Sequence, residues 1–311
     1  MFVVPSGLEA QRERSVEWAA WLDGLPRLVS GLLEDWELAV TGAPRHGKTA
    51  LVLPVSHTDG SRLMLKVARP EPDNAGEVEA HKAWRGLGAV RLERADPHRG
   101  ALLLERLTAR DLNSVDALEA CQVVARLYPR LHLPPTPRLP LLADQLSTWL
   151  DDLAALGRDV PAPPRFVQQA LAAGRALVED PPTAIVHGDL HYGNVLAGRR
   201  EPWLAIDPKG FSGDPASELG PLLWNRWEDL VATGDVGGAL RERFYVLVDA
   251  TGLDERRCRD WVVVRAMVGV GWEASEARAC GRSLGPEQRA WITRLVTTAK
   301  AMQEVGAPPS W

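Results

Sequence analysis

Three polar side chains lie in residues 185–207 in an order that suits phosphoryl transfer. Asp189 supplies a carboxylate, Asn194 an amide oxygen five residues later, and Asp207 a second carboxylate eighteen residues after Asp189. In phosphoryl transfer one carboxylate orients the attacking hydroxyl and accepts its proton, while a neutral oxygen and another carboxylate hold Mg²⁺ against the nucleotide phosphates. Taken alone, the first two side chains could simply form turn hydrogen bonds. The His-Gly pair before them and the Asp after them favour the chemical interpretation.

The elements that would position these side chains are short apolar runs. Residues 185–186, 195–197 and 203–206 are apolar, and polar or turn-forming residues separate them. Short apolar runs bounded by turn residues predict buried strands. The polar residues therefore lie in a loop between strands, and Asp207 ends the last strand.

The same residues resemble a known family. His187-Gly188-Asp189-Leu190-His191, then Asn194-Val195-Leu196, then Ile206-Asp207-Pro208 are similar to the catalytic and metal-binding segments of the aminoglycoside phosphotransferase family. The surrounding residues, including Gly213-Asp214-Pro215, resemble the branch that contains streptomycin 6-phosphotransferases and hydroxyurea phosphotransferases. The resemblance covers residues 36–230 well and the remainder loosely.

This resemblance implies an α+β fold of the bilobal protein-kinase-like type, with a small antiparallel β-sheet lobe and a larger, mainly helical lobe. It implies ATP and Mg²⁺, with Asp189 as the catalytic residue and Asn194 and Asp207 as metal ligands. It also implies that Glu105 and Leu107, in a hinge, contact the nucleotide. His187 would brace the loop by hydrogen bonds.

Length and composition limit the class of protein. The 311 residues are enough for one large or two ordinary domains, with 45% hydrophobic and 25% charged residues. The net charge of -5 argues against nucleic acid as the main partner and suits a small cationic substrate. The widely spaced Cys121, Cys258 and Cys280 predict neither a metal site nor a disulfide framework. Without a signal peptide or a long apolar run, we expect a cytoplasmic protein with no membrane partner. We also expect a monomer.

The first third of the chain predicts a β-rich unit, residues 1–104. Residues 8–33 predict two short helices separated near Gly24-Leu25-Pro26. Five mostly antiparallel strands should follow, with a helix at residues 75–87 between them and a hairpin turn at Thr58-Asp59-Gly60. We expect those strands at residues 36–40, 51–55, 63–67, 90–92 and 101–104.

The rest of the chain predicts a hinge at residues 105–110 and a helical lobe at residues 111–311. Ser114 is a plausible N-cap for a helix that ends at Leu131. Further helices are expected at residues 141–156 and 165–177 and over most of the chain after residue 215. Asp214 and Glu218 should stabilise the helix start at Pro215, because negative side chains suit helix N-termini.

Residues 42–49 match the phosphate-binding pattern G-x-x-x-x-G-K-[ST] letter for letter. That pattern requires a strand before the loop and a helix after it. Here a proline-containing apolar run follows, so we favour a flexible turn between the first two strands, lying over the nucleotide. Gly42 and Gly47 would then allow close approach to phosphate, and Lys48 would be incidental or a secondary contact. The competing interpretation predicts a helix after Thr49.

Lys66 lies among apolar residues of the third expected strand. A buried ammonium needs a partner, although an edge-strand Lys could extend to water instead. In kinase-like folds such a Lys bridges the phosphates and a helix Glu. Of the two candidates we choose Glu77 over Glu79, because Glu77 shares a helix face with the apolar Ala80 and Trp84.

The acceptor site is less specific in the sequence. Carboxylates of the helical lobe could bind a cationic acceptor with an aromatic wall beside them, although each could equally belong to a solvated helix face. The candidates are Glu228, Asp229, Glu273, Glu276 and Trp224. The resemblance favours streptomycin, at its 6-hydroxyl, over hydroxyurea or another small metabolite.

Three further alternatives remain at this stage. A non-catalytic nucleotide-binding protein should lack one of the four key residues, and all four are present. A zinc site at His187 and His191 is disfavoured, because they lie in a loop with no third ligand nearby. Lys209 could contact phosphate or pair with a surface acid.

Overall fold

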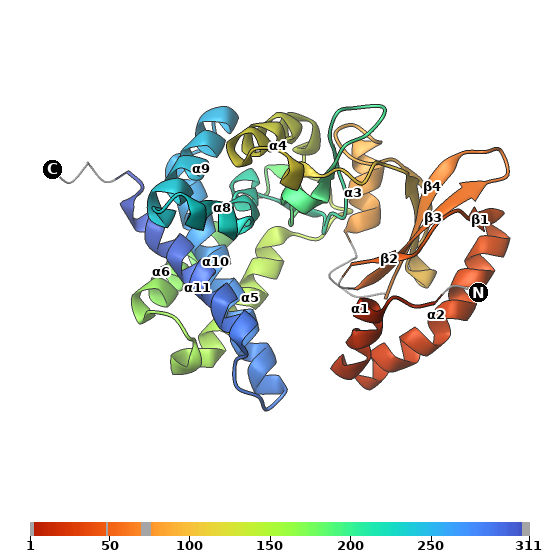
Figure 1. Cartoon of the computed structure of the whole chain (residues 1–311). Helices are drawn as coiled ribbons and strands as arrows, with labels where there is room; N and C mark the ends of the chain where they lie inside the picture. Colours follow the sequence, from red (N-terminus) through yellow and green to blue (C-terminus); the bar gives the residue numbers. More distant parts are fainter. Residues whose placement is uncertain (1–2, 48, 70–75, 307–311) are drawn as a thin grey trace.

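The computed structural model describes residues 3–47, 49–69 and 76–306. An antiparallel sheet with helices from the N-terminus forms one end of the molecule, and helices form most of the other end (Figure 1). Among the described residues, no helix is both long and apolar enough to span a bilayer.

The sheet runs in the order β1-β3-β4-β6-β5, with β2 paired to β3. Its neighbouring strands are antiparallel, as predicted, and the expected turn at Thr58-Asp59-Gly60 closes the β3–β4 hairpin, with His57 N donating to Ser61 O at 3.0 Å. The strands are β1 (Leu38–Val40), β2 (Arg45–His46), β3 (Ala50–His57), β4 (Arg62–Ala68), β5 (Leu92–Asp96) and β6 (Ala101–Glu105). The short β2 was not predicted.

The strand expected at residues 90–92 is displaced. Val90 N donates to Ala205 O at 2.9 Å, and Ala89 forms a parallel bridge with Ala205, so this segment pairs with the helical part of the chain. The strand that pairs with β6 starts only at Leu92. Residues 89–90 therefore join the two parts of the molecule.

The predicted break in the N-terminal helices is wrong. After α1 (Ser6–Glu9) and a 3₁₀ turn η1 (Ala10–Arg14), helix α2 runs unbroken from Val16 to Asp35 through Pro26. Proline removes one helical hydrogen bond, but an apolar stripe continues across it and packs against the sheet (Figure 1). The buried residues of α2 are Trp18, Leu22, Leu25, Val29 and Leu32.

Helix α3 (Glu77–Trp84) lies between the sheet and the helical part (Figure 1). It begins within the span expected for it, and the residues before it lie outside the described part of the chain. Trp84 is fully buried, and its indole N–H donates to Leu131 O at 2.7 Å. This bond ties α3 to the far end of α4 (Ala117–Leu131).

Asp116, rather than the predicted Ser114, caps α4. Its carboxylate accepts from Leu118 N at 2.9 Å and from Glu119 N at 3.1 Å. Ser114 instead ends the 3₁₀ turn η4 (Leu112–Ser114), where its hydroxyl donates to Asp111 O at 2.6 Å. An N-cap carboxylate satisfies N–H groups that the helix itself leaves without acceptors.

The remaining helices enclose a large apolar core, in which α10 is buried along much of its length. They are α5 (Leu142–Leu156), α6 (Pro164–Val178), α7 (Gly220–Trp224), α8 (Trp227–Ala232), α9 (Val236–Thr251), α10 (Glu255–Ala279) and α11 (Pro286–Ala301), with 3₁₀ turns η3 (Pro97–Arg99), η5 (Gly157–Asp159), η6 (Tyr192–Asn194), η7 (Pro215–Glu218) and η8 (Met302–Glu304). Asp214 caps η7, as expected, by accepting from Ala216 N at 3.0 Å.

Two short pairs of antiparallel strands lie within the helical part. Strands β8 (Val195–Leu196) and β9 (Leu204–Ala205) pair antiparallel, and β7 (Ala184–Val186) pairs with β10 (Phe211–Gly213). The strand β10 was not predicted, since Phe-Ser-Gly carries little strand signal. These pairs position the loop that contains Asp189 between β7 and β8 and position Asp207 after β9.

Candidate active site

Lys66 of β4 joins two carboxylates from distant parts of the chain. Its Nζ lies 2.6 Å from Glu77 Oε1 of α3 and also contacts Asp207, which follows β9. Lys66 and Glu77 are buried, whereas the Asp207 side chain is 54% exposed. Glu79 lies elsewhere and bonds Lys82 at 2.7 Å. The lysine therefore links the sheet, α3 and the segment after β9.

The charges of this triad reinforce one another. Burial opposes the charge of Lys66, but the two carboxylates outweigh it and raise the Lys66 pKa. Burial likewise raises the pKa of Glu77, and the ammonium more than compensates, so that pKa lies below its usual value. Removal from solvent opposes the charge of Asp207, but attraction to Lys66 lowers the Asp207 pKa to about 2. All three groups are ionised at neutral pH.

Asp207 has a left-handed backbone conformation with φ of 58°. This region is uncommon for residues other than glycine, although Asp tolerates it better than most. Strained backbone of this kind is concentrated at functional sites. Asp207 adopts this conformation just after the end of β9, and its carboxylate contacts Lys66.

The loop that carries Asp189 is held by its own polar groups. The Asn194 amide nitrogen donates to Asp189 O at 2.9 Å, and Ile206 N donates to Asn194 O at 2.9 Å. The His187 ring lies between these segments: Nε2 bonds Ile206 O at 2.9 Å, and Nδ1 accepts from Asp189 N at 3.3 Å. Burial lowers the His187 pKa, so the ring is neutral and braces the loop.

This geometry disfavours a zinc site at His187 and His191. Both ring nitrogens of His187 bond the protein itself, and the His191 ring accepts from Gly193 N at 3.1 Å. Lys209 lies close enough to Asp207 to contribute to the lowered pKa of that carboxylate.

Glu218 has a different position from the one expected. Its carboxylate does not cap a helix but accepts from His187 N at 3.2 Å and from Gly188 N at 2.7 Å, fully buried beneath the loop. Burial raises the pKa of Glu218, but His132 and His187 and the backbone N–H groups outweigh it, so the pKa is lowered. Arg265 of α10 holds the other side of Gly188, donating to its carbonyl at 3.2 Å. Nothing in the local sequence around either residue signals these contacts.

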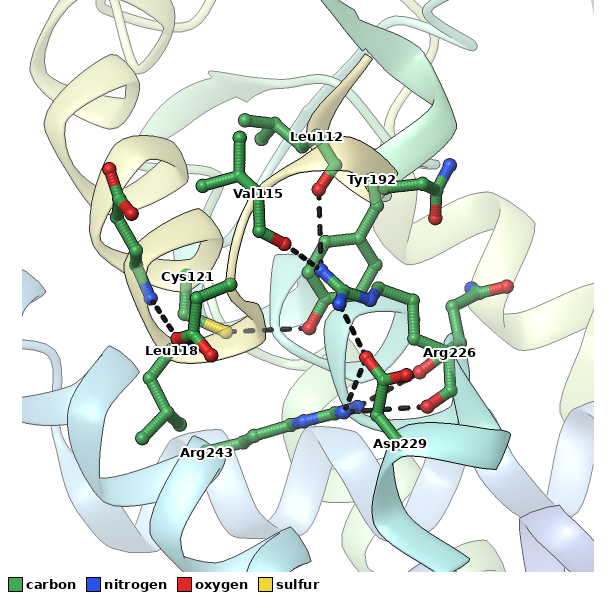
Figure 2. Close-up of polar contacts among 12 residues, drawn as sticks. Leu112, Val115, Leu118, Cys121, Tyr192, Arg226, Asp229 and Arg243 are labelled. Carbon is green, nitrogen blue, oxygen red and sulfur yellow. Dashed lines mark hydrogen bonds and ion pairs between the residues drawn. The ribbon is translucent and has the colours of Figure 1, made fainter. Parts of the chain in front are cut away.

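Figure 2 shows how Tyr192, three residues after Asp189, is anchored. The guanidinium groups of Arg226 and Arg243 lie 5.3 and 6.0 Å from the centroid of its ring, and its hydroxyl donates to Leu222 O at 2.8 Å. Asp229 pairs with Arg226 at 2.5 Å. The loop is therefore fixed from α7, α8 and α9 as well as from Glu218.

The structure divides the expected acceptor residues into two groups. Trp224 is buried, Asp229 belongs to the arginine network of Figure 2, and Glu228 bonds Arg294 at 3.1 Å. All three have protein contacts, although the Glu228 side chain is 78% exposed. Glu273 and Glu276 of α10 form no ion pair with any residue that the structure describes.

The glycine-rich segment lies between β1 and β3, and a strand follows it. Because β3 begins at Ala50, the helix required by the competing phosphate-loop interpretation is absent from residues 50–56, which the structure describes as strand. A side chain at Gly42 would approach the Pro54 ring at 3.0 Å, whereas Gly47 has open space around its Cα. Lys48 lies outside the described residues.

The segment after β6 contacts both parts of the molecule. Glu105 accepts from Arg91 N at 3.2 Å and from Arg200, in the β8–β9 turn, at 3.0 Å. Leu107 is half-buried against an apolar cluster around Leu102 and Leu104. Thr108 N then donates to Ala197 O at 3.0 Å.

A family model described as aminoglycoside/hydroxyurea antibiotic resistance kinase matches residues 35–277. The chain belongs to this family. It is 40% identical over 283 residues to a streptomycin 6-kinase of Streptomyces glaucescens, covering 89% of this chain and 92% of that protein. It is 43% identical over 263 residues to a hydroxyurea phosphotransferase of Kitasatospora aureofaciens, covering 82% and 75%.

Solved structures share the fold. A choline/ethanolamine kinase family protein from Mesorhizobium loti superposes with a TM-score of 0.60 at 17% identity, covering 89% of this chain and 95% of that one. A choline kinase from Streptococcus pneumoniae gives 0.57 at 11% identity, covering 89% and 99%. The fold is thus protein-kinase-like and bilobal, as expected. The chain is a small-molecule kinase, and kinases of this type use ATP as co-substrate.

Proposed function

We propose that this protein transfers the γ-phosphate of ATP to streptomycin at its 6-hydroxyl and thereby confers resistance. The observation that carries this proposal is the convergence of Lys66, Glu77 and Asp207 beside the braced loop of Asp189. Membership of the resistance-kinase family and 40% identity to a streptomycin 6-kinase support the choice of acceptor.

In this mechanism Asp189 orients the acceptor hydroxyl and accepts its proton. Its backbone is bonded through both N–H and carbonyl to His187 and Asn194, so little reorganisation accompanies the reaction. Lys66 binds the α- and β-phosphates, and Glu77 keeps the ammonium charged and oriented. The reaction needs little covalent chemistry from the protein, because positioning and charge provide most of the acceleration.

Asn194 and Asp207 fit a Mg²⁺ ion. Their oxygens are the hard donors that Mg²⁺ prefers. The Asn194 amide nitrogen is engaged by Asp189 O, which leaves the side-chain oxygen as the donor for a cation. When bound, the ion would neutralise phosphate charge; Asp207 would then share its carboxylate between the ion and Lys66.

The nucleotide would lie between a lobe of residues 1–104 and a lobe of residues 111–311, with residues 105–110 as the hinge. The half-buried side chains of Met64, Leu107 and Ile206 around the apolar cluster near Leu104 suit one face of an adenine. Gly42 and Gly47 would cover the phosphates, and Glu105 would fix the hinge through Arg200.

A second acceptor, hydroxyurea, is supported by the 43% identity to a hydroxyurea phosphotransferase. We further propose that the enzyme is a cytoplasmic monomer whose acceptor is cationic. A non-catalytic role is disfavoured, because Lys66, Asp189, Asn194 and Asp207 are all present.

The test is a phosphorylation screen with ATP and Mg²⁺, in which streptomycin, other aminoglycosides and hydroxyurea are offered separately. Mass spectrometry of the product, followed by NMR of the phosphorylated position, identifies the acceptor hydroxyl. Product from hydroxyurea alone would replace the proposed acceptor, and product from neither would refute both.

A further inference from the structure

The start of α3 and the segment that follows Asp207 touch backbone to backbone. Gly76 directly precedes Glu77 at the beginning of α3, and Gly210 lies three residues after Asp207. A Cβ placed on Gly76 would lie 1.9 Å from Gly210 O and 2.4 Å from Lys209 O. A Cβ on Gly210 would in turn lie 2.4 Å from Gly76 O. Two glycines therefore face each other where no side chain fits.

The segment 209–210 is also bonded to the loop of Asp189. Its two backbone N–H groups donate to His187 O at 2.9 and 3.2 Å. Close packing continues there, because a Cβ on Gly188 would approach the Phe211 ring at 3.0 Å. The start of α3 and the loop therefore both rest on the same short segment, and a shift of that segment would be felt by both.

The two touching segments carry the two carboxylates that hold Lys66. Glu77 is the neighbour of Gly76, and its Oε1 lies 2.6 Å from the Lys66 ammonium. Asp207, on the segment that ends at Gly210, contacts the same ammonium. A hydrogen bond as short as 2.6 Å leaves α3 little room to move away without losing it. The spacing of the glycines thus controls whether both carboxylates reach Lys66.

We propose that Gly76 and Gly210 are positioning residues, whose contact places α3 and, through Glu77, the Lys66 ammonium that binds the phosphates. The inference rests on the proposed kinase function. Protein kinases control activity by moving the helix that carries the corresponding Glu, whereas here a backbone contact holds that helix. Gly76 has an ordinary φ of -82°, so the close approach alone requires glycine there; Gly210 has a φ of 71°, which favours glycine as well.

Gly76→Ala tests the contact without straining the backbone. Because a Cβ does not approach a carbonyl oxygen more closely than about 3 Å, the added methyl group should push the two segments apart by roughly 1 Å. A displacement of that size at a phosphate-binding group should lower the kcat at saturating streptomycin about 10- to 100-fold. The Kd of streptomycin should stay unchanged, because the substitution acts on the groups that bind the nucleotide.

Nucleotide binding gives a readout that needs no acceptor. Calorimetry with Mg²⁺ and AMP-PNP, a non-hydrolysable ATP analogue, should show a Kd about 5-fold higher in Gly76→Ala than in the wild type, the equivalent of one hydrogen bond. Gly24→Ala is the matched control, because Gly24 is exposed on α2 and a Cβ there would meet no other atom within 4 Å. Its kcat and its Kd for AMP-PNP should equal those of the wild type.

A double-mutant cycle shows whether the glycine acts through Glu77. If it does, adding Gly76→Ala to Glu77→Gln should lower kcat by less than about 3-fold further, since the Lys66–Glu77 pair is already weakened. A loss as large as in the wild-type background would overturn this coupling.

Hydrogen exchange on the wild type tests the contact even if Gly76→Ala does not fold. When the contact holds α3, AMP-PNP should leave the exchange of residues 80–84 unchanged relative to that of β3 in the same lobe. A relative slowing of about 10-fold or more would mean that the nucleotide orders α3, and would overturn the inference.

The outcomes separate the two proposals. Wild-type kcat and AMP-PNP affinity in Gly76→Ala overturn the positioning role, as does a loss of streptomycin affinity as large as the loss of kcat. Absence of phosphorylated streptomycin from the wild type overturns the proposed function, while the AMP-PNP titration and hydrogen exchange still decide the role of the glycines. Absence of AMP-PNP binding by the wild type overturns both.

Discussion

Glu218→Gln is the substitution that most directly tests how the Asp189 loop is held. The wild-type carboxylate is fully buried and accepts from two consecutive backbone N–H groups, those of His187 and Gly188. Glutamine has nearly the same shape but only one acceptor oxygen, and its amide nitrogen would face an N–H donor. One hydrogen bond is therefore lost, and a buried donor is left without an acceptor.

The cost can be estimated from those two bonds. A hydrogen bond to a charged group contributes about 1.5–3 kcal/mol, and a stranded buried donor costs about 1–3 kcal/mol, so Glu218→Gln should lower the free energy of unfolding by about 2.5–6 kcal/mol. At about 2 °C per kcal/mol, the lower end of the usual range because the chain is long, the Tm should fall by roughly 5–12 °C. The kcat should fall as well, because Asp189 follows the loosened backbone, while nucleotide affinity through Lys66 should persist.

The pH dependence has a defined sign. The folded-state pKa of Glu218 lies below its unfolded value of about 4.3. Its contribution to stability is therefore complete above that value and is lost as the pH falls through the folded pKa. The stability difference between wild type and Glu218→Gln should be constant near neutral pH and should shrink on acidification.

Denaturant unfolding at pH 7 and at pH 4 measures both effects, with Glu242→Gln as a control that changes the same charge on the exposed face of α9. A Glu218→Gln variant within about 0.5 kcal/mol of wild type, the range of an ordinary surface change, would refute this account of the loop. So would a difference that increases in acid.

Three further predictions concern the reacting groups. Asp207→Ala should abolish transfer and Mg²⁺-dependent nucleotide binding in a folded protein, and normal Mg²⁺-dependent affinity by calorimetry would remove Asp207 from the metal role. Lys66→Ala should reduce turnover by orders of magnitude and Lys48→Ala only mildly; the reverse order in steady-state assays would contradict the assignment of Lys66. Asp189→Asn should leave nucleotide binding nearly unchanged and reduce phosphoryl transfer by about 10² or more, so full activity would exclude Asp189 as the catalytic base.

The sequence alone predicted the features that depend on neighbours along the chain. The β3–β4 hairpin follows from its turn residues, and the strand–loop–strand arrangement around Asp189 follows from apolar runs separated by polar residues. The choice of Glu77 over Glu79 as the partner of Lys66 needed only the spacing of apolar residues on one helix face. In each case the deciding contacts are local or repeat with the period of the element.

Helix and cap boundaries were less predictable, because tertiary packing competes with local propensity. Pro26 indicates a helix end, but the buried stripe of α2 against the sheet outweighs one missing hydrogen bond. Ser114 and Asp116 are both acceptable caps, and the start of the buried face of α4 selects Asp116. Residues 89–90 have strand propensity, yet their partner is β9 and not β6.

Only the tertiary structure decided which distant groups meet. Lys66 and Asp207 are 141 residues apart, and Glu218 reaches the loop from about 30 residues away. The residue types of Glu228, Asp229, Glu273 and Glu276 are equivalent in the sequence, but packing places arginines beside the first two and leaves the last two without an ion pair to any described residue. Local sequence determines which groups the chain carries and which face of an element presents them. The burial of apolar faces against one another determines which of those groups meet in ion pairs and hydrogen bonds.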